Sequence, residues 1–294
     1  MMIHWVDAHA VCDALGGHWY SRYGLAFCPA HDNRRTPALS LANGHDGKLL
    51  AKCFAGCSFI DIIEALRGLG ILGLNGQNHT PNPAVIARHH EVDKAERLRR
   101  IAQAKHIWDE SLQVSGSLAE TYLRGRAITI AAPDTLRFHS RCWHSPSARR
   151  HPALVGKVER QGKLVGVMRT YLGLDGVKAR IEKPKMALGS CAGGAVRLAR
   201  PKAGHLCIGE GIETCLSAMV LGLGPAWACL STSGLKSVQL PDEVRRVTVL
   251  ADADEEGLAA ALETQRRLSL SGRRVTIAEP VGRNDFNDLL GTQS

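Results

Sequence analysis

The sequence predicts an α+β ribbon at the N-terminus, followed by a mixed α/β region that ends in a Rossmann-like parallel sheet. Three observations support this prediction. Paired cysteine and histidine residues occur early in the chain, a stretch rich in Gly, Asn and Pro follows them, and strand-like segments alternate with helix-like segments near the C-terminus. Such alternation indicates βαβ units and a sheet covered on both faces. We expect boundaries that give the segments 1–70, 71–90 (a linker), 91–203 and 204–294.

Hydrophobic periodicity predicts three helices in the first half of the chain. In residues 59–72 the apolar side chains are spaced for one face of a helix. A helical pattern recurs over 93–114, and a shorter helix is expected over 118–124. The stretch between the first two helices lacks periodicity, which is typical of a linker.

Turn residues and strand-like segments predict the rest of the secondary structure. Two segments, 155–160 and 163–172, flank a Gln-Gly pair and are expected to form a hairpin. An Asp-Gly pair predicts another turn before a strand at 177–182. After residue 204 the expected strands are 205–210, 225–231, 245–252 and 273–280, and the expected helices are 212–222, 255–272 and 284–291.

The composition is that of a globular protein. Of the 294 residues, 45% are hydrophobic and 22% are charged, and mean hydropathy is −0.10. No stretch approaches the roughly 20 apolar residues of a membrane span, and the first residues do not resemble a secretory signal. The nine cysteines are an odd number, which disfavours a disulfide framework. We therefore expect a cytoplasmic protein with no membrane partner.

Positive charge is concentrated in one part of the chain. The formal net charge is +9, and residues 141–202 contain 14 Lys and Arg but three acids, a local charge of +11. A basic segment of this size in an otherwise nearly neutral chain favours a polyanionic partner such as nucleic acid. The alternative is a basic surface that is only solvated.

Two close pairs of metal-ligating residues lie in the N-terminal part. Cys28 and His31 form a C-x2-H pair, and Cys53 and Cys57 form a C-x3-C pair after 21 intervening residues. Three thiolates and one imidazole suit tetrahedral Zn²⁺, and four protein ligands indicate a structural zinc. The metal would add stability that about 70 residues could hardly gain from a core alone. Chance spacing of reduced cysteines is the alternative.

Cations lie between these two pairs. The intervening segment has alternating apolar residues and turn-forming Asn-Gly and Asp-Gly pairs, which predict a small antiparallel sheet. Arg34, Arg35, Lys48 and Lys52 would project from it. Such a ribbon could contact phosphates, although ordinary surface charge explains these residues equally well.

Acidic residues follow two of the predicted strands. Glu210 lies between two glycines at the end of one strand, and Asp252 and Asp254 follow another. Because the carboxyl ends of parallel strands meet at one edge of a sheet, we expect these acids to converge. Mg²⁺ would relieve their repulsion and accept phosphate oxygens. The alternative is that each acid only caps a helix. Residues 284–288 add acids and amides, and Asp288 could support the metal or cap the last helix.

Together these motifs resemble a known family. A resemblance to the zinc-binding domain of bacterial and phage DNA primases is carried by CPAHDNRRTPALSL and KCFAGC. A resemblance to the Toprim domain, shared by primases, topoisomerases and some nucleases, is carried by IGEGIETCLSA and VLADADEEGLAAA. The basic segment between them resembles the one that precedes Toprim in primase-like proteins of phages, plasmids and integrated elements. The resemblance spans nearly the whole chain. It implies an α+β zinc ribbon, a mixed α/β catalytic region and a C-terminal Toprim domain.

The sequence departs from the family pattern at two points. Its second cysteine pair is C-x3-C, where replicative primases commonly have C-x2-C, which changes the turn but not the number of ligands. No G-x-x-x-x-G-K-[ST] loop occurs, so unwinding of DNA would need a separate helicase partner.

The resemblance implies synthesis of short RNA primers from ribonucleoside triphosphates on a single-stranded DNA template. It implies that Glu210 is a catalytic acid, that Asp252 and Asp254 are ligands of Mg²⁺ or Mn²⁺, and that the zinc module contacts template. The candidates for holding triphosphate and template are Arg169, Lys178, Lys183 and Lys185, with Arg34, Arg35 and Lys52 in the zinc module. Alternation along a strand places Arg169 and Tyr171 on one face, so both are expected to face the groove.

Two other functions fit the same residues. Toprim carboxylates can also cleave phosphodiesters through metal-activated water, which would make the protein a nuclease. A zinc ribbon with a degenerate Toprim domain could instead be a non-enzymatic DNA-binding module. A topoisomerase is disfavoured, because it needs a suitably placed tyrosine nucleophile and only four tyrosines occur.

Overall fold

The computed structural model describes residues 6–20, 22–32, 36–44, 48–73, 83–283 and 285–292, with backbone only for 83–90, 92, 93 and 292. It divides into two compact units, residues 1–97 and 98–294. The helix α3 (Pro83–Glu110) contains the point of division. Of the predicted linker, residues 74–82 lie outside the described part, and 83–90 belong to α3. No helix in the described ranges is both long and apolar enough to span a membrane.

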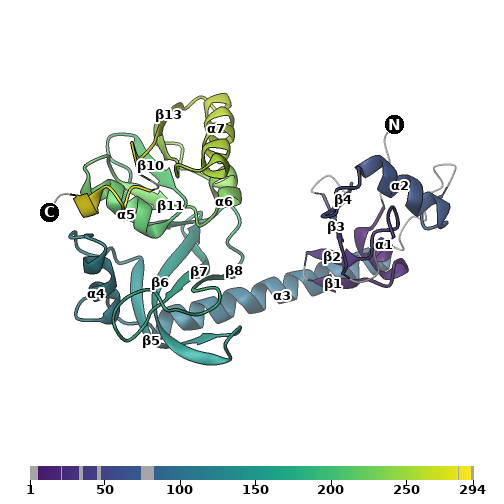
Figure 1. Ribbon diagram of the computed structural model, residues 1–294, viewed down its shortest axis with the longest axis horizontal. Coiled ribbons are helices and arrows are strands. Elements are labelled where there is room, and N and C mark those ends of the chain that lie inside the picture. Colours follow the sequence, from purple (N-terminus) through teal and green to yellow (C-terminus); the bar gives the residue numbers. More distant parts are fainter. Residues whose placement is uncertain are drawn as a thin grey trace. The chain divides into compact units, whose positions relative to one another are not determined.

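The N-terminal unit has a four-stranded antiparallel sheet with one helix on either side of it in the sequence (Figure 1). Its core contains the inward-facing residues Leu39, Leu41 and Ile62, all fully buried. The predicted sheet between the two cysteine pairs is β3 and β4, and the predicted helix is α2. The sequence did not predict α1, β1 and β2. The elements are α1 (Ala8–Ala14), β1 (His18–Tyr20), β2 (Tyr23–Ala26), β3 (Leu39–Asn43), β4 (Leu49–Cys53) and α2 (Phe59–Gly68).

A capping box fixes the start of α2, directly after the second cysteine pair. The Ser58 side chain accepts a hydrogen bond from the backbone N–H of Asp61, and the Asp61 carboxylate accepts one from the backbone N–H of Ser58. These bonds satisfy amide groups that the first turn of a helix leaves free. The helix therefore begins at Phe59, two residues after Cys57, and holds this cysteine at a defined position.

The C-terminal unit contains a single nine-stranded sheet (Figure 1). Its strand order is β13-β12-β10-β11-β9-β6-β7-β8, and β5 pairs with β6. Strands β10 to β13 are parallel, whereas β9 joins β11 to β6 by antiparallel pairing, so the sheet continues across position 204. The strands are β5 (Leu136–His144), β6 (Arg149–Arg160), β7 (Lys163–Tyr171), β8 (Lys185–Gly189), β9 (Ala195–Arg197), β10 (His205–Gly209), β11 (Ala226–Ala228), β12 (Arg246–Leu250) and β13 (Arg274–Ala278).

Helices cover both faces of the parallel part. Along β10, Cys207 packs into the core cluster that includes α5, while Leu206 and Ile208 pack into the cluster that includes α6 and α7. This alternation is the period of two that a strand imposes. The predicted Rossmann-like arrangement is therefore present in this part of the sheet. The helices of the unit are α4 (Leu118–Gly125), α5 (Ile212–Val220), α6 (Thr232–Ser237) and α7 (Glu255–Leu270).

The structure confirms the predicted hairpin and corrects two other elements. Gln161 and Gly162 have φ values of 50° and 75°, as a two-residue hairpin turn between β6 and β7 requires. The strand predicted at 177–182 is irregular, and β8 begins at Lys185 instead. Residue 284 of the helix predicted at 284–291 lies outside the described residues, and 285–289 form a bend and turns, followed by a short 3-10 helix at Leu290–Thr292. Strands β5 and β9 and helix α6 were not predicted.

Candidate metal centres

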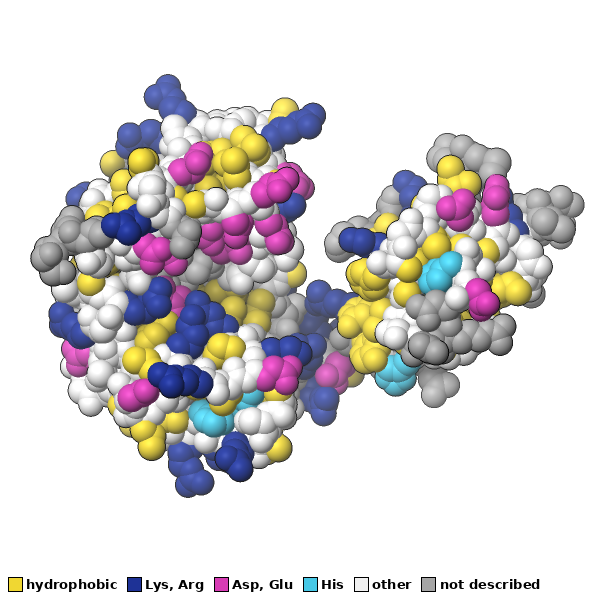
Figure 2. All heavy atoms as spheres, viewed as in Figure 1, with side chains coloured by type: hydrophobic (Ala, Val, Ile, Leu, Met, Phe, Trp, Pro, Cys, Tyr) yellow, Lys and Arg dark blue, Asp and Glu magenta, His cyan; other side chains and the backbone are white. Residues whose placement is uncertain are grey.

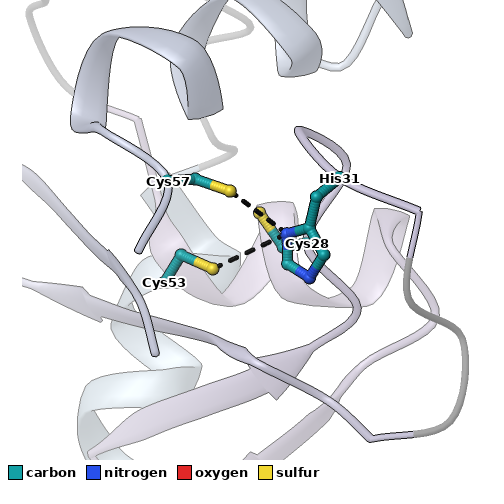
Figure 3. Close-up of side chains that lie close together, drawn as sticks. All are labelled: Cys28, His31, Cys53 and Cys57. Carbon is teal, nitrogen blue, oxygen red and sulfur yellow. Dashed lines mark hydrogen bonds between the residues drawn. The ribbon is translucent and has the colours of Figure 1, made fainter. Parts of the chain in front are cut away.

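The first candidate centre is formed by the two predicted ligand pairs. Their ligand atoms all lie within 4.8 Å of one another. The Nδ1 atom of His31 is 3.1 Å from the Sγ of Cys57 and 3.7 Å from the Sγ of Cys53 (Figure 3). Cys28 follows β2, Cys53 ends β4, and Cys57 precedes α2, so the sheet and the helix together bring the four residues to one point.

These side chains fit a zinc ion. Three sulfur atoms and one imidazole nitrogen are the donors of structural tetrahedral sites. The backbone N–H of Ala55 donates to the Sγ of Cys53 at 3.3 Å, which favours the thiolate form that binds metal. In the described part of the chain, this is the sole group of three or more His, Cys, Asp or Glu side chains that is close enough to hold an ion. The acids of the second centre are therefore spaced more widely.

The second candidate centre is a cavity of about 240 Å³ at the carboxyl ends of β10 and β12. Four acids line it, namely Glu210, Glu213, Asp252 and Asp285, together with Lys185. On one face of the C-terminal unit, acidic side chains gather next to Lys and Arg side chains (Figure 2). The remaining lining residues are Met168, Thr170, Gly211, Ile212, Thr214 and Leu230.

Burial and repulsion between neighbouring acids raise the pKa values of two acids in this cavity, Glu210 and Asp252. Burial, and then the charges of Asp252, Asp254 and Glu256, raises the pKa of Glu210 to about 7. Burial also raises the pKa of Asp252, with Asp285 and Asp254 adding to the effect and Lys185 opposing it. The Oδ1 atom of Asp252 is buried and has no hydrogen-bond partner. An unpaired carboxylate oxygen beside other acids fits a hard divalent cation such as Mg²⁺.

The predicted convergence of Glu210 and Asp252 is present, whereas Asp254 lies apart from the cavity lining. The Oδ1 atom of Asp254 accepts a hydrogen bond from the N–H of Gly257 at 2.6 Å and caps the start of α7. Asp254 still contributes negative charge to its neighbours. Asp285 lines the cavity in place of Asp288. The acid-rich run 284–288 was the available signal for Asp285, although spacing alone did not show which acid faces inward.

Lys185 is the predicted cation that reaches the cavity. Its Nζ lies 2.9 Å from the Oε2 of Glu213, and the hydroxyl of Tyr122 donates to the Oε1 of Glu213 at 2.7 Å. Burial, and then the charge of nearby Lys185, lowers the pKa of Lys178. The sequence analysis missed Glu213 and Tyr122. Both lie in helices, and only the fold brings Tyr122 into contact with Glu213 at the cavity wall.

The structure corrects the expectation that Arg169 and Tyr171 face a nucleic-acid groove. They do share a face of β7, but that face is interior: Arg169 is 6% exposed and Tyr171 is fully buried. The Arg169 guanidinium donates to the carbonyls of Met186 and Trp143, and the Tyr171 hydroxyl also donates to Trp143. Strand alternation shows which residues share a face but not which face is buried.

The other predicted cations are on the surface or outside the described residues. Lys183 is 68% exposed and lies 3.6 Å from Glu182, apart from the cavity lining. Lys52 is exposed, and its Nζ lies 5.8 Å from the centre of the Phe54 ring. Arg34 and Arg35 lie outside the described residues. A contact of any of these cations with nucleic acid stays a prediction.

A pH-dependent stability follows from the Glu210 environment. Because its pKa is near 7 in the folded protein and about 4.5 otherwise, the folded state binds the proton more tightly, and stability is lost as pH rises between these values. Replacing Glu210 by Gln should therefore raise the melting temperature of metal-free protein at pH 8 and change it much less at pH 5. Thermal unfolding followed by circular dichroism measures this. The exposed Glu263→Gln on α7 is the control. An equal effect of Glu210→Gln at both pH values would contradict the assigned environment.

Two family models match parts of the chain. Residues 205–294 match the family model of the Toprim domain, and residues 98–198 match a domain of unknown function, DUF7146. The C-terminal part of the chain therefore matches the Toprim domain, in the region where the sequence motifs predicted one. It contains Glu210, Asp252 and Asp285, whereas Lys185 and Tyr122 come from the segment that matches DUF7146. No curated protein matches the chain.

Several solved structures are similar in fold. A DNA primase domain from Pseudomonas aeruginosa is 16% identical with a TM-score of 0.43, over 65% of this chain and 73% of that one. The primase fragment of the bacteriophage T7 primase-helicase protein is 14% identical with a TM-score of 0.40, over 63% and 71%. The Aquifex aeolicus primase, with zinc-binding and RNA polymerase domains, is 13% identical with a TM-score of 0.40, over 97% and 80%.

Proposed function

We propose that the protein is a DNA primase that synthesises short RNA primers on single-stranded DNA by metal-dependent nucleotidyl transfer. The observation that carries this proposal is the cavity in the segment that matches the Toprim domain, in which half-buried acids meet a lysine. Transfer of a nucleotide displaces pyrophosphate from an α-phosphate, so negative charge develops on both the attacking and the leaving oxygens. A centre that combines acids for a metal with a cation for the triphosphate suits this reaction.

The acids and the lysine of the cavity would have different roles. Glu210, Asp252 and Asp285 would hold Mg²⁺ or Mn²⁺, which when bound stabilises the charge on the attacking 3′-hydroxyl and on the leaving pyrophosphate. Lys185 lines the same cavity and would bind the triphosphate. Asp254 would act through its charge and through the start of α7, which it caps.

The N-terminal unit would bind the template. Tyr20 and Tyr23 are 43% and 42% exposed, and their rings stack with 5.2 Å between centres. Leu50 and Phe54 are also exposed, and Lys52 lies beside Phe54. Exposed aromatic rings next to a cation suit the bases and phosphates of a single strand. The zinc ion would keep this small unit folded.

A single assay separates this function from its two rivals. Purified protein is incubated with single-stranded DNA, ribonucleoside triphosphates and Mg²⁺ or Mn²⁺. Short products that begin with a ribonucleotide support a primase. Shortened DNA would instead identify a nuclease, and a shift in DNA mobility without either product would identify a binding module. The nuclease remains the second candidate because the same acids can activate water.

A further inference from the structure

Glu213 is a buried charge at the wall of the acidic cavity, and both of its carboxylate oxygens are already engaged. Its side chain is 5% exposed. Oε2 accepts from the Nζ of Lys185 at 2.9 Å, and Oε1 accepts from the hydroxyl of Tyr122 at 2.7 Å. Burial raises the pKa of Glu213, but the charge and hydrogen bond of Lys185 and the bond from Tyr122 outweigh it, so the pKa is lowered. Each carboxylate oxygen of Glu213 therefore already accepts one hydrogen bond from a protein donor.

A buried ion pair of this kind is poorly explained by stability alone. Apolar side chains of similar volume often stabilise a fold as well as a buried ion pair does. The pair is also unequal, because the Lys185 side chain is 39% exposed and lines the cavity while Glu213 is almost fully enclosed. An ammonium has three N–H donors, and Glu213 takes one of them. The arrangement leaves Lys185 able to bind a second anion.

Lys185 has other acids close to it. Lys185 lines the same cavity as Asp252, and its charge opposes the rise in the pKa of Asp252. A lysine side chain is flexible, so without a fixed partner Lys185 would pair with the carboxylates assigned to the metal. Tyr122 in α4 fixes Glu213 in turn. Burial and the Glu213 charge raise the pKa of Tyr122, so its hydroxyl stays a donor.

We propose that Glu213, held by Tyr122, is a positioning residue that fixes the ammonium of Lys185 at the cavity wall, where Lys185 contacts the triphosphate of the incoming nucleotide. This inference rests on the proposed function. It also explains why the site draws residues from both matched segments: Tyr122 and Lys185 come from 98–198, and Glu213 comes from the Toprim domain. Glu213 acts through Lys185 and does not itself contact the nucleotide.

The test is a double-mutant cycle in the full-length chain, with primer synthesis measured as a function of nucleotide concentration. Glu213→Gln should raise the KM for nucleotide about tenfold, and Tyr122→Phe should raise it less. In a Lys185→Ala background, Glu213→Gln should raise the KM for nucleotide little further, because the lysine that Glu213 positions is gone. The matched control is Glu159→Gln, which removes another carboxylate paired with a lysine at 2.9 Å, outside the cavity. Its KM should be unchanged.

Two results would overturn this role. One is a rise in KM on Glu213→Gln that is the same in the wild-type and the Lys185→Ala backgrounds. The other is a rise in KM for Glu159→Gln that matches the rise for Glu213→Gln. If the wild-type protein makes no primers, the proposed function fails, and the same cycle is measured by calorimetric titration with ATP and Mg²⁺. A loss of affinity that depends on Lys185 still supports positioning, whereas no binding by the wild type overturns it.

Discussion

Replacing Asp252 by Asn should abolish primer synthesis while the fold stays intact. The Oδ1 atom of Asp252 is buried and has no partner, beside Glu210 and Asp285 in the same cavity. An amide is neutral and holds a divalent cation poorly, so stabilisation of several kcal/mol in the transition state is lost. That corresponds to a fall in rate of about a thousandfold. Incorporation of labelled ribonucleotide on single-stranded DNA measures the effect.

The affinity of Asp252→Asn for single-stranded DNA should be unchanged, because the proposed template surface is in the N-terminal unit. Its melting temperature without metal should not fall, since the substitution removes a repelling charge. Asp242→Asn, an exposed acid outside the cavity, is the matched control and should keep full activity. Synthesis by Asp252→Asn at the wild-type rate would remove Asp252 from the metal site.

Replacing Cys53 by Ser should release zinc and unfold the N-terminal unit. Cys53 supplies one of four ligand atoms that lie within 4.8 Å of one another. A unit of this size has a small core, and in such units the free energy of metal binding is largely the free energy of folding. Zinc content measured by atomic absorption should fall from one ion per chain to nearly none. Limited proteolysis should then cleave residues 6–73 rapidly.

The control for this experiment is Cys191→Ser, a cysteine of the C-terminal unit whose Sγ donates to the carbonyl of Leu188. It should keep one zinc per chain and resist proteolysis in the N-terminal unit. A full complement of zinc in Cys53→Ser would show that the ligand set is wrongly assigned. Zinc loss without faster proteolysis would show that the metal does not hold the fold of this unit.

Local patterns in the sequence were enough to predict much of the fold. The zinc ligands were found because two close pairs need only a turn each to converge, and the structure brings Cys28, His31, Cys53 and Cys57 together. The parallel strands were found because they are short apolar runs that alternate with amphipathic helices. The resulting edge of the sheet placed Glu210 and Asp252 in one cavity, as predicted.

The parts that could not be predicted depend on contacts between distant residues. The hydrogen bond from Tyr122 to Glu213 joins residues 91 positions apart, and no local spacing in the sequence predicts it. Strand β8 begins at Lys185 and not in 177–182, after a residue with φ of 53° and a proline. The strand that contains Arg169 was predicted correctly, but the side chain is buried because its face of the strand packs against other elements.

The measurement that tests the central claim most directly is a template swap. The protein is supplied with single-stranded DNA of two designed sequences, each with one labelled ribonucleotide at a time and Mg²⁺ or Mn²⁺. We expect short products that contain only the ribonucleotides complementary to the template, and a change of product when the template changes. Products that ignore the template, or no ribonucleotide incorporation on any template, would contradict the assignment of this Toprim protein as a primase.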